Sequence, residues 1–289
     1  MCPQQEMRII EGVPEMARAC RESVRPLGLV PTMGALHEGH LALVRQARRE
    51  NPSLAVSIFV NPAQFGPQED LAQYPRDLER DLNLLRQEGC DLVFTPQAES
   101  IYPPGFDTWV DVGALADRLE GAVRPRHFRG VATVVTKLLN ITRPQRAYFG
   151  QKDGQQTVVV RRLVRDLDLG CDVVVVPTVR APDGLALSSR NVYLTAEQRR
   201  AAPVMYRALC RAKELWSAGV RDAGKLRREV RRVLSSEPLI ERIDYISVAD
   251  AYTLEELDAV AGRAMVLVAV KLGIPRLIDN TVLDNVTLE

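Results

Sequence analysis

The sequence predicts an α/β fold in which a doubly wound parallel sheet is followed by a second, smaller α+β domain. In the first 180 residues, short apolar runs alternate with segments of helical periodicity, which is typical of strand-helix-strand units. Beyond residue 179 the pattern changes to longer helical runs and then to strand-like segments. We therefore expect a Rossmann-like domain over residues 1–178 and a smaller C-terminal domain over residues 179–289.

The expected elements follow in order along the chain. Apolar runs flanked by Pro, Gly or Asn predict strands at 27–30, 54–60, 92–94, 146–149 and 172–176. Apolar residues at helical spacing predict helices that include 131–139 and 160–167. In the second domain, Thr195 and Gln198 form a capping-box pattern that opens a helix, and residues 243–248 and 265–270 have the composition of strands. Because ligands of a doubly wound sheet bind beyond the carboxyl ends of its strands, functional residues should follow each strand.

Composition excludes several classes of protein. A hydrophobic fraction of 46% and a charged fraction of 26% are ordinary for a soluble protein, and no apolar stretch is long enough to span a bilayer. The N-terminal residues are acidic and polar where a signal peptide would be basic and then apolar. We therefore expect a cytoplasmic protein that does not enter a membrane.

Cysteine usage and charge narrow the function further. The five cysteines are scattered and form no CxxC pair, so we expect reduced thiols rather than disulfides or a thiolate zinc site. The net charge of +1 gives no overall attraction for nucleic acid. A basic run at 225–232 is typical of a solvated helix face, and an RNA-binding module that uses this run is the alternative from outside enzymology.

The segment PTMGALHEGH, residues 31–40, joins the first long strand to a helix. Gly39 lets the backbone approach a ligand, the helix start offers unpaired N–H groups, and His37 and His40 can meet one phosphate. This combination predicts an anion site. A zinc site that uses His37, Glu38, His40 and His127 is disfavoured, because the two neighbouring histidines stand at i and i+3 rather than at i and i+4.

Three further loops carry polar side chains after predicted strands. In the loop 177–191, two serines and Arg190 suit a triphosphate, although a serine-rich loop that caps the next helix explains them as well. In the segment 148–156, Lys152 supplies a charge for phosphate, Asp153 could accept from ribose hydroxyls, and Gln156 could read hydroxyl or carboxylate groups. A plain N-capped helix is the alternative there. The loop 61–66 contains Gln64.

The HEGH and SSRN segments resemble the HIGH and KMSKS signatures of the nucleotidylyltransferase and class I aminoacyl-tRNA synthetase superfamily, which implies adenylyl transfer. The fuller strings narrow this resemblance to the pantothenate synthetase (pantoate-β-alanine ligase) family: PTMGALHEGH, SIFVNPAQF, YPRDLERD, HFRGVATVVTKLLN, YFGQKDGQQ and VPTVRAPDGLALSSRNVYL. It covers about residues 28–194 with high specificity and is weaker beyond.

The resemblance implies a ligase that makes pantothenate in two steps. Pantoate attacks the α-phosphorus of ATP and releases pyrophosphate, and the amine of β-alanine then attacks the pantoyl adenylate and releases AMP. Magnesium accompanies the ATP, and the protein is a homodimer through its N-terminal domain. The C-terminal domain is expected to act as a lid that keeps water from the acyl adenylate.

The resemblance also assigns residues to roles. Phosphate chemistry falls to His37, His40, Lys152, Ser188, Ser189 and Arg190. Pantoate contacts fall to Met33, Gln64 and Gln156. Contacts with ATP fall to Met33, Gly39, Gly150, Lys152, Asp153, Val179, Ser188, Ser189 and Arg190, and Asp81 is placed near Mg²⁺.

Two positions depart from the family pattern, and one alternative keeps the fold. Gly154 stands where relatives often carry an aromatic residue, and Arg80 stands where they carry a second carboxylate beside Asp81. The alternative is an adenylyltransferase that acts on a phosphorylated acceptor, which would need more basic contacts than Gln64 and Gln156 provide.

Overall fold

A computed structural model describes residues 6–67 and 69–284 of the chain. The fold divides into two compact units. Unit 1 comprises Met1–Gly150 and Val159–Val176, and unit 2 comprises Gln151–Val158 and Pro177–Glu289. The helix α7 (Gly154–Asp166) therefore begins in unit 2 and ends in unit 1.

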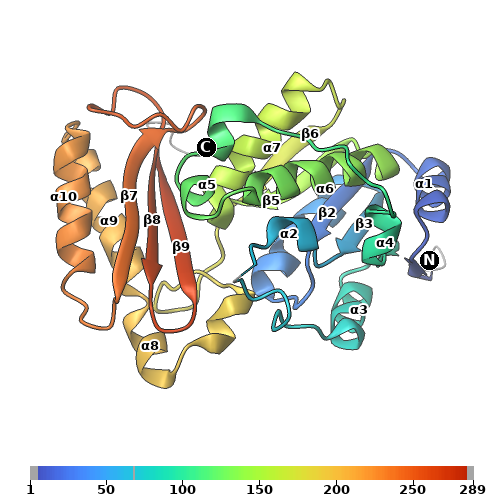
Figure 1. Ribbon diagram of the computed structural model, residues 1–289, viewed down its shortest axis with the longest axis horizontal. Helices are drawn as coiled ribbons and strands as arrows, with labels where there is room; N and C mark the ends of the chain where they lie inside the picture. The colour runs from blue at the N-terminus through green and yellow to red at the C-terminus, as the bar shows by residue number, and fades with distance from the viewer. Residues whose placement is uncertain (1–5, 68, 285–289) are drawn as a thin grey trace. The chain divides into compact units, whose positions relative to one another are not determined.

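Unit 1 is built on a six-stranded sheet in which all pairs of neighbouring strands are parallel, in the order β1-β4-β3-β2-β5-β6. The strands are β1 (Arg8–Ile10), β2 (Leu27–Thr32), β3 (Ser53–Ile58), β4 (Leu92–Phe94), β5 (Arg146–Gly150) and β6 (Asp172–Val176). The helices that connect them lie on both faces of the sheet, as Figure 1 shows. They are α1 (Val13–Glu22), α2 (Glu38–Glu50), α3 (Leu78–Gln87), α4 (Ala98–Ile101), α5 (Glu120–Val123), α6 (His127–Thr142) and α7, with short 3-10 turns η1 (Pro62–Gln64), η2 (Gly113–Ala116) and η3 (Gln151–Asp153), the last in unit 2.

The core of unit 1 explains why β2 and α2 meet at a fixed junction. Val44 and Ala47 of α2 are fully buried and belong to one apolar cluster with Val30 of β2. Gly28 lets α2 approach closely, because a Cβ there would lie 2.7 Å from Asn51 Nδ2. This packing holds the start of β2 against the end of α2, and the loop in which the sequence predicts the anion site joins their other ends.

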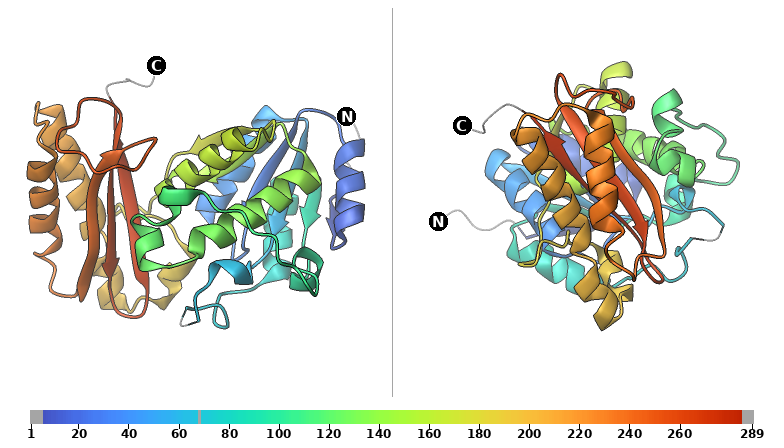
Figure 2. Two further views of the ribbon diagram at one scale, coloured as in Figure 1. Left: turned by 45° about the horizontal axis from the view of Figure 1, so that its top comes forward. Right: turned by 90° about the vertical axis from the view of Figure 1, so that its left-hand side faces the viewer.

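Unit 2 is built on a three-stranded antiparallel sheet in the order β7-β8-β9. Its strands are β7 (Arg242–Asp250), β8 (Ala264–Lys271) and β9 (Arg276–Leu283), and its helices are α8 (Ala196–Ala201), α9 (Val204–Ser217) and α10 (Ala223–Leu234), after the 3-10 turn η4 (Ser189–Tyr193). Figure 2 shows α9 and α10 side by side on one face of this sheet. The basic run lies on α10, whose Leu226, Val230 and Leu234 are fully buried against this unit's core.

The architecture confirms the predicted fold class, including the capping box between Thr195 and Gln198 at the start of α8. Three details differ from the expected elements. The strand β3 ends at Ile58 rather than at residue 60, because the chain turns into η1. The strands β1 and β9 are not among those predicted, since β1 has three residues and β9 buries polar side chains that interrupt an apolar pattern.

Two expectations from composition can be compared with the described part of the chain. Cys20, Cys90, Cys171 and Cys210 are free thiols, and burial raises the pKa of the first three to about 12. Cys2 lies outside the described residues. Among residues 6–67 and 69–284, no helix is both long and apolar enough to cross a membrane.

Candidate active site

The loop between β2 and α2 has a strained backbone that one carboxylate holds in place. Gly34 has φ 81° and Ala35 has φ 51°, both in the left-handed region that disfavours most side chains. The backbone N–H groups of Ala35 and Leu36 each donate to Asp81, at 2.8 Å to Oδ2 and 2.8 Å to Oδ1. Asp81 therefore fixes the shape of the loop that leads into the histidine pair.

The side chains of His37 and His40 both accept backbone N–H groups at the N-terminus of α2. His37 is the N-cap, and its Nδ1 accepts the N–H of Gly39 at 3.1 Å. The Nδ1 of His40 accepts the N–H of His37 at 3.4 Å, and the two rings lie 4.1 Å apart between centroids. This pattern assigns the proton of each neutral ring to Nε2. The arrangement gives two imidazole N–H donors at the positive end of a 13-residue helix, which suits an anion.

Gln64 and Met33 come together in unit 1. The Nε2 of Gln64 donates to Met33 Sδ at 3.0 Å, and its Oε1 accepts from Asn61 Nδ2 at 3.1 Å. The turn that carries Gln64 packs tightly on α6, because a Cβ on Gly130 would lie 2.2 Å from Ala63 O. The position of the Gln64 amide is thus set by neighbours on three segments.

Glu69, Arg124 and His127 form a network that bonds to the backbone of Gln64, and the sequence alone predicts no function for this network. His127 Nδ1 donates to Gln64 O at 2.9 Å, and Arg124 Nη1 donates to His127 Nε2 at 3.2 Å. Arg124 in turn forms an ion pair with Glu69, with its Nε 2.9 Å from Oε1. Burial and the nearby Arg124 lower the pKa of His127 to about 4, so the ring is neutral near pH 7. Nothing in the sequence signals the bonds to Glu69 and to Gln64 O, because each of them joins residues about 60 positions apart.

In unit 2, the segment after β5 carries the second predicted group. Gly150 ends β5, and Lys152 and Asp153 follow it in the turn η3, where Lys152 Nζ lies 3.3 Å from Asp153 Oδ1. Gln156 is half-buried on the first turn of α7. The structure therefore gathers a cation, a carboxylate and an amide at the start of one helix.

The loop after β6 is a hairpin that ends in the serine-arginine segment. Leu187 N donates to Val179 O at 3.0 Å, and Ala181 N donates to Leu185 O at 2.9 Å. Ser188 caps the 3-10 turn that follows, because its Oγ accepts the N–H of Arg190 at 3.3 Å. Ser189 and Arg190 lie in that turn. The hairpin thus brings Val179 to the base of the loop that presents Ser188 to Arg190.

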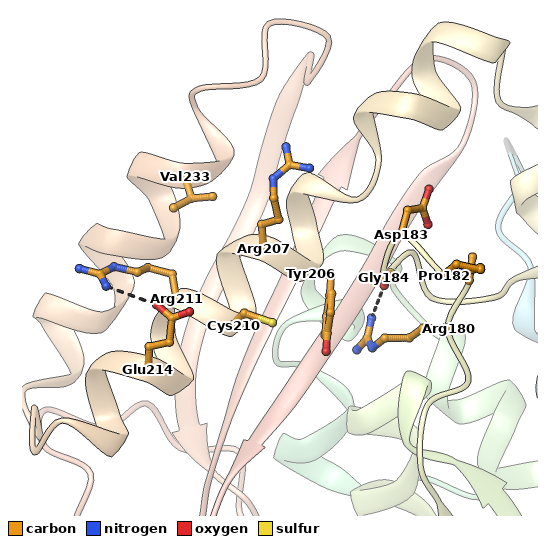
Figure 3. Close-up of a pocket in the computed structure, with 11 residues that line it drawn as sticks. Arg180, Pro182, Asp183, Gly184, Tyr206, Arg207, Cys210, Arg211, Glu214 and Val233 are labelled. Atoms are coloured by element: carbon orange, nitrogen blue, oxygen red, sulfur yellow. Dashed lines mark hydrogen bonds and ion pairs between the residues drawn. The ribbon is translucent and has the colours of Figure 1, made fainter.

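A hollow of about 690 Å³ is bordered by residues 180–184 of this hairpin. Figure 3 shows it, with Arg180 beside the ring of Tyr206 and bonded to Gly184 O at 3.1 Å. Its lining residues include Arg207, Arg211 and Cys210 but none of the predicted phosphate-binding side chains. We therefore place no substrate in it.

The predicted magnesium contact can be tested against geometry. Both oxygens of Asp81 already accept a backbone N–H, and its side chain is 1% exposed. Arg80 Nη1 lies 3.9 Å from the same carboxylate. Among residues 6–67 and 69–284, no three His, Cys, Asp or Glu side chains gather as metal ligands would. The described residues do not fit a magnesium site built by the protein alone.

Comparison with known proteins places this geometry in a family. The model of the pantoate-beta-alanine ligase family matches residues 6–282. A pantothenate synthetase of Chloroflexus aurantiacus is 61% identical over 279 residues, which are 96% of this chain and 99% of that protein. One of Roseiflexus sp. is 58% identical over 278 residues, with 96% and 100% covered.

Solved structures agree. The pantothenate synthetase of Thermus thermophilus matches with a TM-score of 0.91 at 51% identity, covering 95% of this chain and 99% of that one. A pantoate-beta-alanine ligase of Francisella tularensis, complexed with beta-gamma ATP and beta-alanine, matches with a TM-score of 0.78 at 34% identity. That match covers 96% of this chain and 97% of the other.

Proposed function

Because the chain belongs to the pantoate-β-alanine ligase family, we propose that it joins pantoate to β-alanine with ATP, through a pantoyl adenylate. In the first step a pantoate carboxylate oxygen bonds to the α-phosphorus while the bond from that phosphorus to the bridging oxygen breaks, which releases pyrophosphate. In the second step the β-alanine amine bonds to the acyl carbon, loses a proton and displaces AMP. The relative from Francisella tularensis is complexed with beta-gamma ATP and beta-alanine, which supports ATP and β-alanine as substrates of this chain.

The observation that carries the chemistry is the histidine pair at the N-terminus of α2. Each ring accepts a backbone N–H at Nδ1, so each neutral ring has its donor proton on Nε2. We assign to His37 and His40 the stabilisation of charge that develops on the phosphoryl oxygens. We also propose that Gly39, which donates its backbone N–H to His37, contacts the nucleotide.

The remaining roles rest on the family and on local geometry. We propose that Lys152, Ser188, Ser189 and Arg190 hold the triphosphate, and that Gly150, Asp153 and Val179 contact the nucleotide. Met33, Gln64 and Gln156 would receive pantoate. Neutral amides suit a carboxylate that must remain nucleophilic, because a cation clamped on it would lower its reactivity.

The magnesium and assembly proposals are separate. We propose that Mg²⁺ arrives on the phosphates of ATP, where it would neutralise their charge. We also propose a homodimer through the N-terminal domain, a C-terminal domain that acts as a lid, and a cytoplasmic location. Light scattering tests the dimer, since a monomeric mass at micromolar concentration would contradict it.

The decisive experiment is exchange of radiolabelled pyrophosphate into ATP. We expect exchange that depends on pantoate and Mg²⁺, and pantothenate and AMP once β-alanine is added. His37→Ala and His40→Ala should each slow exchange about a hundredfold, as loss of one preorganised donor does elsewhere. Folded protein without pantoate-dependent exchange would refute the function, and full activity in both variants would refute only the role of the histidines.

A further inference from the structure

Two buried polar residues stand in the middle of β9. Asp279 is 4% exposed and Asn280 is 3% exposed, in a strand whose other residues include Leu277 and Leu283 of the apolar core. Burial of such groups is costly unless every polar atom is bonded. The hydrogen bonds of Asp279 and Asn280 therefore indicate why polar residues are buried at these positions.

The side chain of Asn280 makes three hydrogen bonds to η3. Its Nδ2 donates to Gln151 O at 2.8 Å and to Lys152 O at 2.9 Å. Its Oδ1 accepts from Gln151 Nε2 at 2.8 Å. One amide thus binds two consecutive carbonyls and one side chain of the segment that carries Lys152.

Gly154 makes room for this amide. A Cβ on Gly154 would lie 3.0 Å from both Cγ and Nδ2 of Asn280. The space at Gly154, the glycine that departs from the family pattern, is therefore filled by a side chain of β9.

The neighbouring Asp279 holds the hairpin in the same way. It accepts from Arg180 Nη1 at 2.6 Å and from Nη2 at 2.9 Å, and Arg180 also bonds to Gly184 O within the hairpin. Figure 3 shows Arg180 and Gly184 at this point. Consecutive residues of one strand therefore anchor both segments of unit 2 that carry predicted phosphate-binding side chains.

We propose that Asn280 is a positioning residue of the nucleotide site, which fixes the backbone of Lys152 so that its ammonium group meets the triphosphate. This inference rests on the proposed function, because it requires that Lys152 bind ATP. An asparagine suits the position, since only an amide offers two N–H donors to the carbonyls and an oxygen to Gln151. An aspartate of the same size would place an oxygen against two carbonyl oxygens.

The test compares Asn280→Ala and Asn280→Asp with Asn51→Ala. Asn51 is also 3% exposed and also binds a backbone carbonyl, Ala47 O at 2.7 Å, but it lies in unit 1 and has no proposed role in catalysis. We expect similar losses of stability in the alanine variants. Only the Asn280 variants should raise the KM for ATP in pyrophosphate exchange, by about tenfold or more, with the KM for pantoate unchanged. Asn280→Asp should raise the KM for ATP more than Asn280→Ala does.

A double-mutant cycle separates positioning from general damage. In a Lys152→Ala background, Asn280→Ala should change the KM for ATP by less than about twofold, because the group it positions is gone. Additive effects in the cycle, or Asn280 variants that match Asn51→Ala in every kinetic constant, would overturn the proposal. If Asn280→Ala does not fold, Asn280→Ser keeps one donor and enters the same cycle. A wild-type protein without exchange would instead mean that the proposed function has failed.

Discussion

Each carboxylate oxygen of Asp81 accepts a hydrogen bond from a backbone N–H, and these two bonds hold the loop before the histidine pair. Burial raises the pKa of this carboxyl, although the two backbone bonds oppose the shift. The same residue is predicted from the family resemblance to lie near magnesium. The two roles lead to different outcomes when the charge is removed.

We expect Asp81→Asn to lower activity without changing the Mg²⁺ requirement. An amide has one acceptor oxygen, so its NH₂ group would face a backbone N–H of Ala35 or Leu36, at a cost of about 1–3 kcal/mol in unfolding free energy. Thermal unfolding and exchange rates against Mg²⁺ concentration measure both effects. Asp77→Asn is the control, because Asp77 caps α3 through Arg80 N and asparagine caps equally well. A half-saturating Mg²⁺ concentration at least about tenfold higher in Asp81→Asn alone would instead show a metal contact.

The contact between α6 and η1 decides the position of the Gln64 turn. Gly130 has no Cβ to push against Ala63 O, and Asn61 Nδ2 donates to Gly130 O at 3.2 Å. A glycine inside a helix costs about 1 kcal/mol relative to alanine. Gly130 therefore lowers helix stability but allows η1 to pack closely on α6. We expect this exchange where a turn that binds a ligand must lie against a helix.

Gly130→Ala should destabilise unit 1 despite the better helix propensity of alanine. The new Cβ would lie 2.2 Å from Ala63 O, and the forced shift should cost about 1–3 kcal/mol and displace Gln64. We expect the KM for pantoate to rise about tenfold while the KM for ATP stays within about twofold. The matched control is Gly262→Ala, since Gly262 has nothing within 4 Å of an added Cβ. An unchanged KM for pantoate in a folded Gly130→Ala protein would remove Gln64 from the pantoate site.

Elements differ in how far local pattern predicts them. Strands such as β2 are predictable because a buried parallel strand is apolar throughout, and the loops after them because parallel strands place their carboxyl ends at one edge. The strand β9 is not, since Asp279 and Asn280 break its apolar pattern and bind segments about 100 residues or more away. The hydrogen bonds from Ala35 and Leu36 to Asp81, and from His127 to Gln64, also join residues far apart in the sequence, so local pattern does not predict them. The sequence thus predicts which loops carry the proposed site residues, and only the tertiary contacts reveal which residues hold these loops in place.

At the scale of the whole molecule, the residues proposed to act on ATP belong to both units. His37 and His40 are in unit 1, whereas Lys152 and the segment Ser188 to Arg190 are in unit 2. The boundary predicted after residue 178 stays a prediction about separately folding domains. Each unit contains one of the two tryptophans, Trp109 in unit 1 and Trp216 in unit 2, so tryptophan fluorescence can follow the unfolding of each unit.

The stability of unit 1 should fall as the pH drops from about 6.5 towards 4. His127 has a pKa of about 4 in the folded protein against 6.5 when unperturbed, so the unfolded chain binds the proton first on acidification. This difference amounts to about 2 kcal/mol at most between pH 7 and pH 5. Glu69 adds a loss only at lower pH: burial alone would raise its pKa, but the hydrogen bond and charge of Arg124 lower it. Asp81, whose pKa is raised, acts in the opposite direction.

Denaturant unfolding followed by Trp109 fluorescence, in a Trp216→Phe background, measures this slope. His127→Asn keeps an N–H donor for Gln64 O but does not titrate, so the decrease between pH 7 and pH 5 should become much smaller. His37→Asn is the control, because it removes a histidine outside the Glu69–Arg124–His127 network and should leave that network's contribution in place. Equal slopes in the His127→Asn and parent proteins would show that His127 is protonated without loss of the network, and the neutral ring would then have no part in holding Gln64.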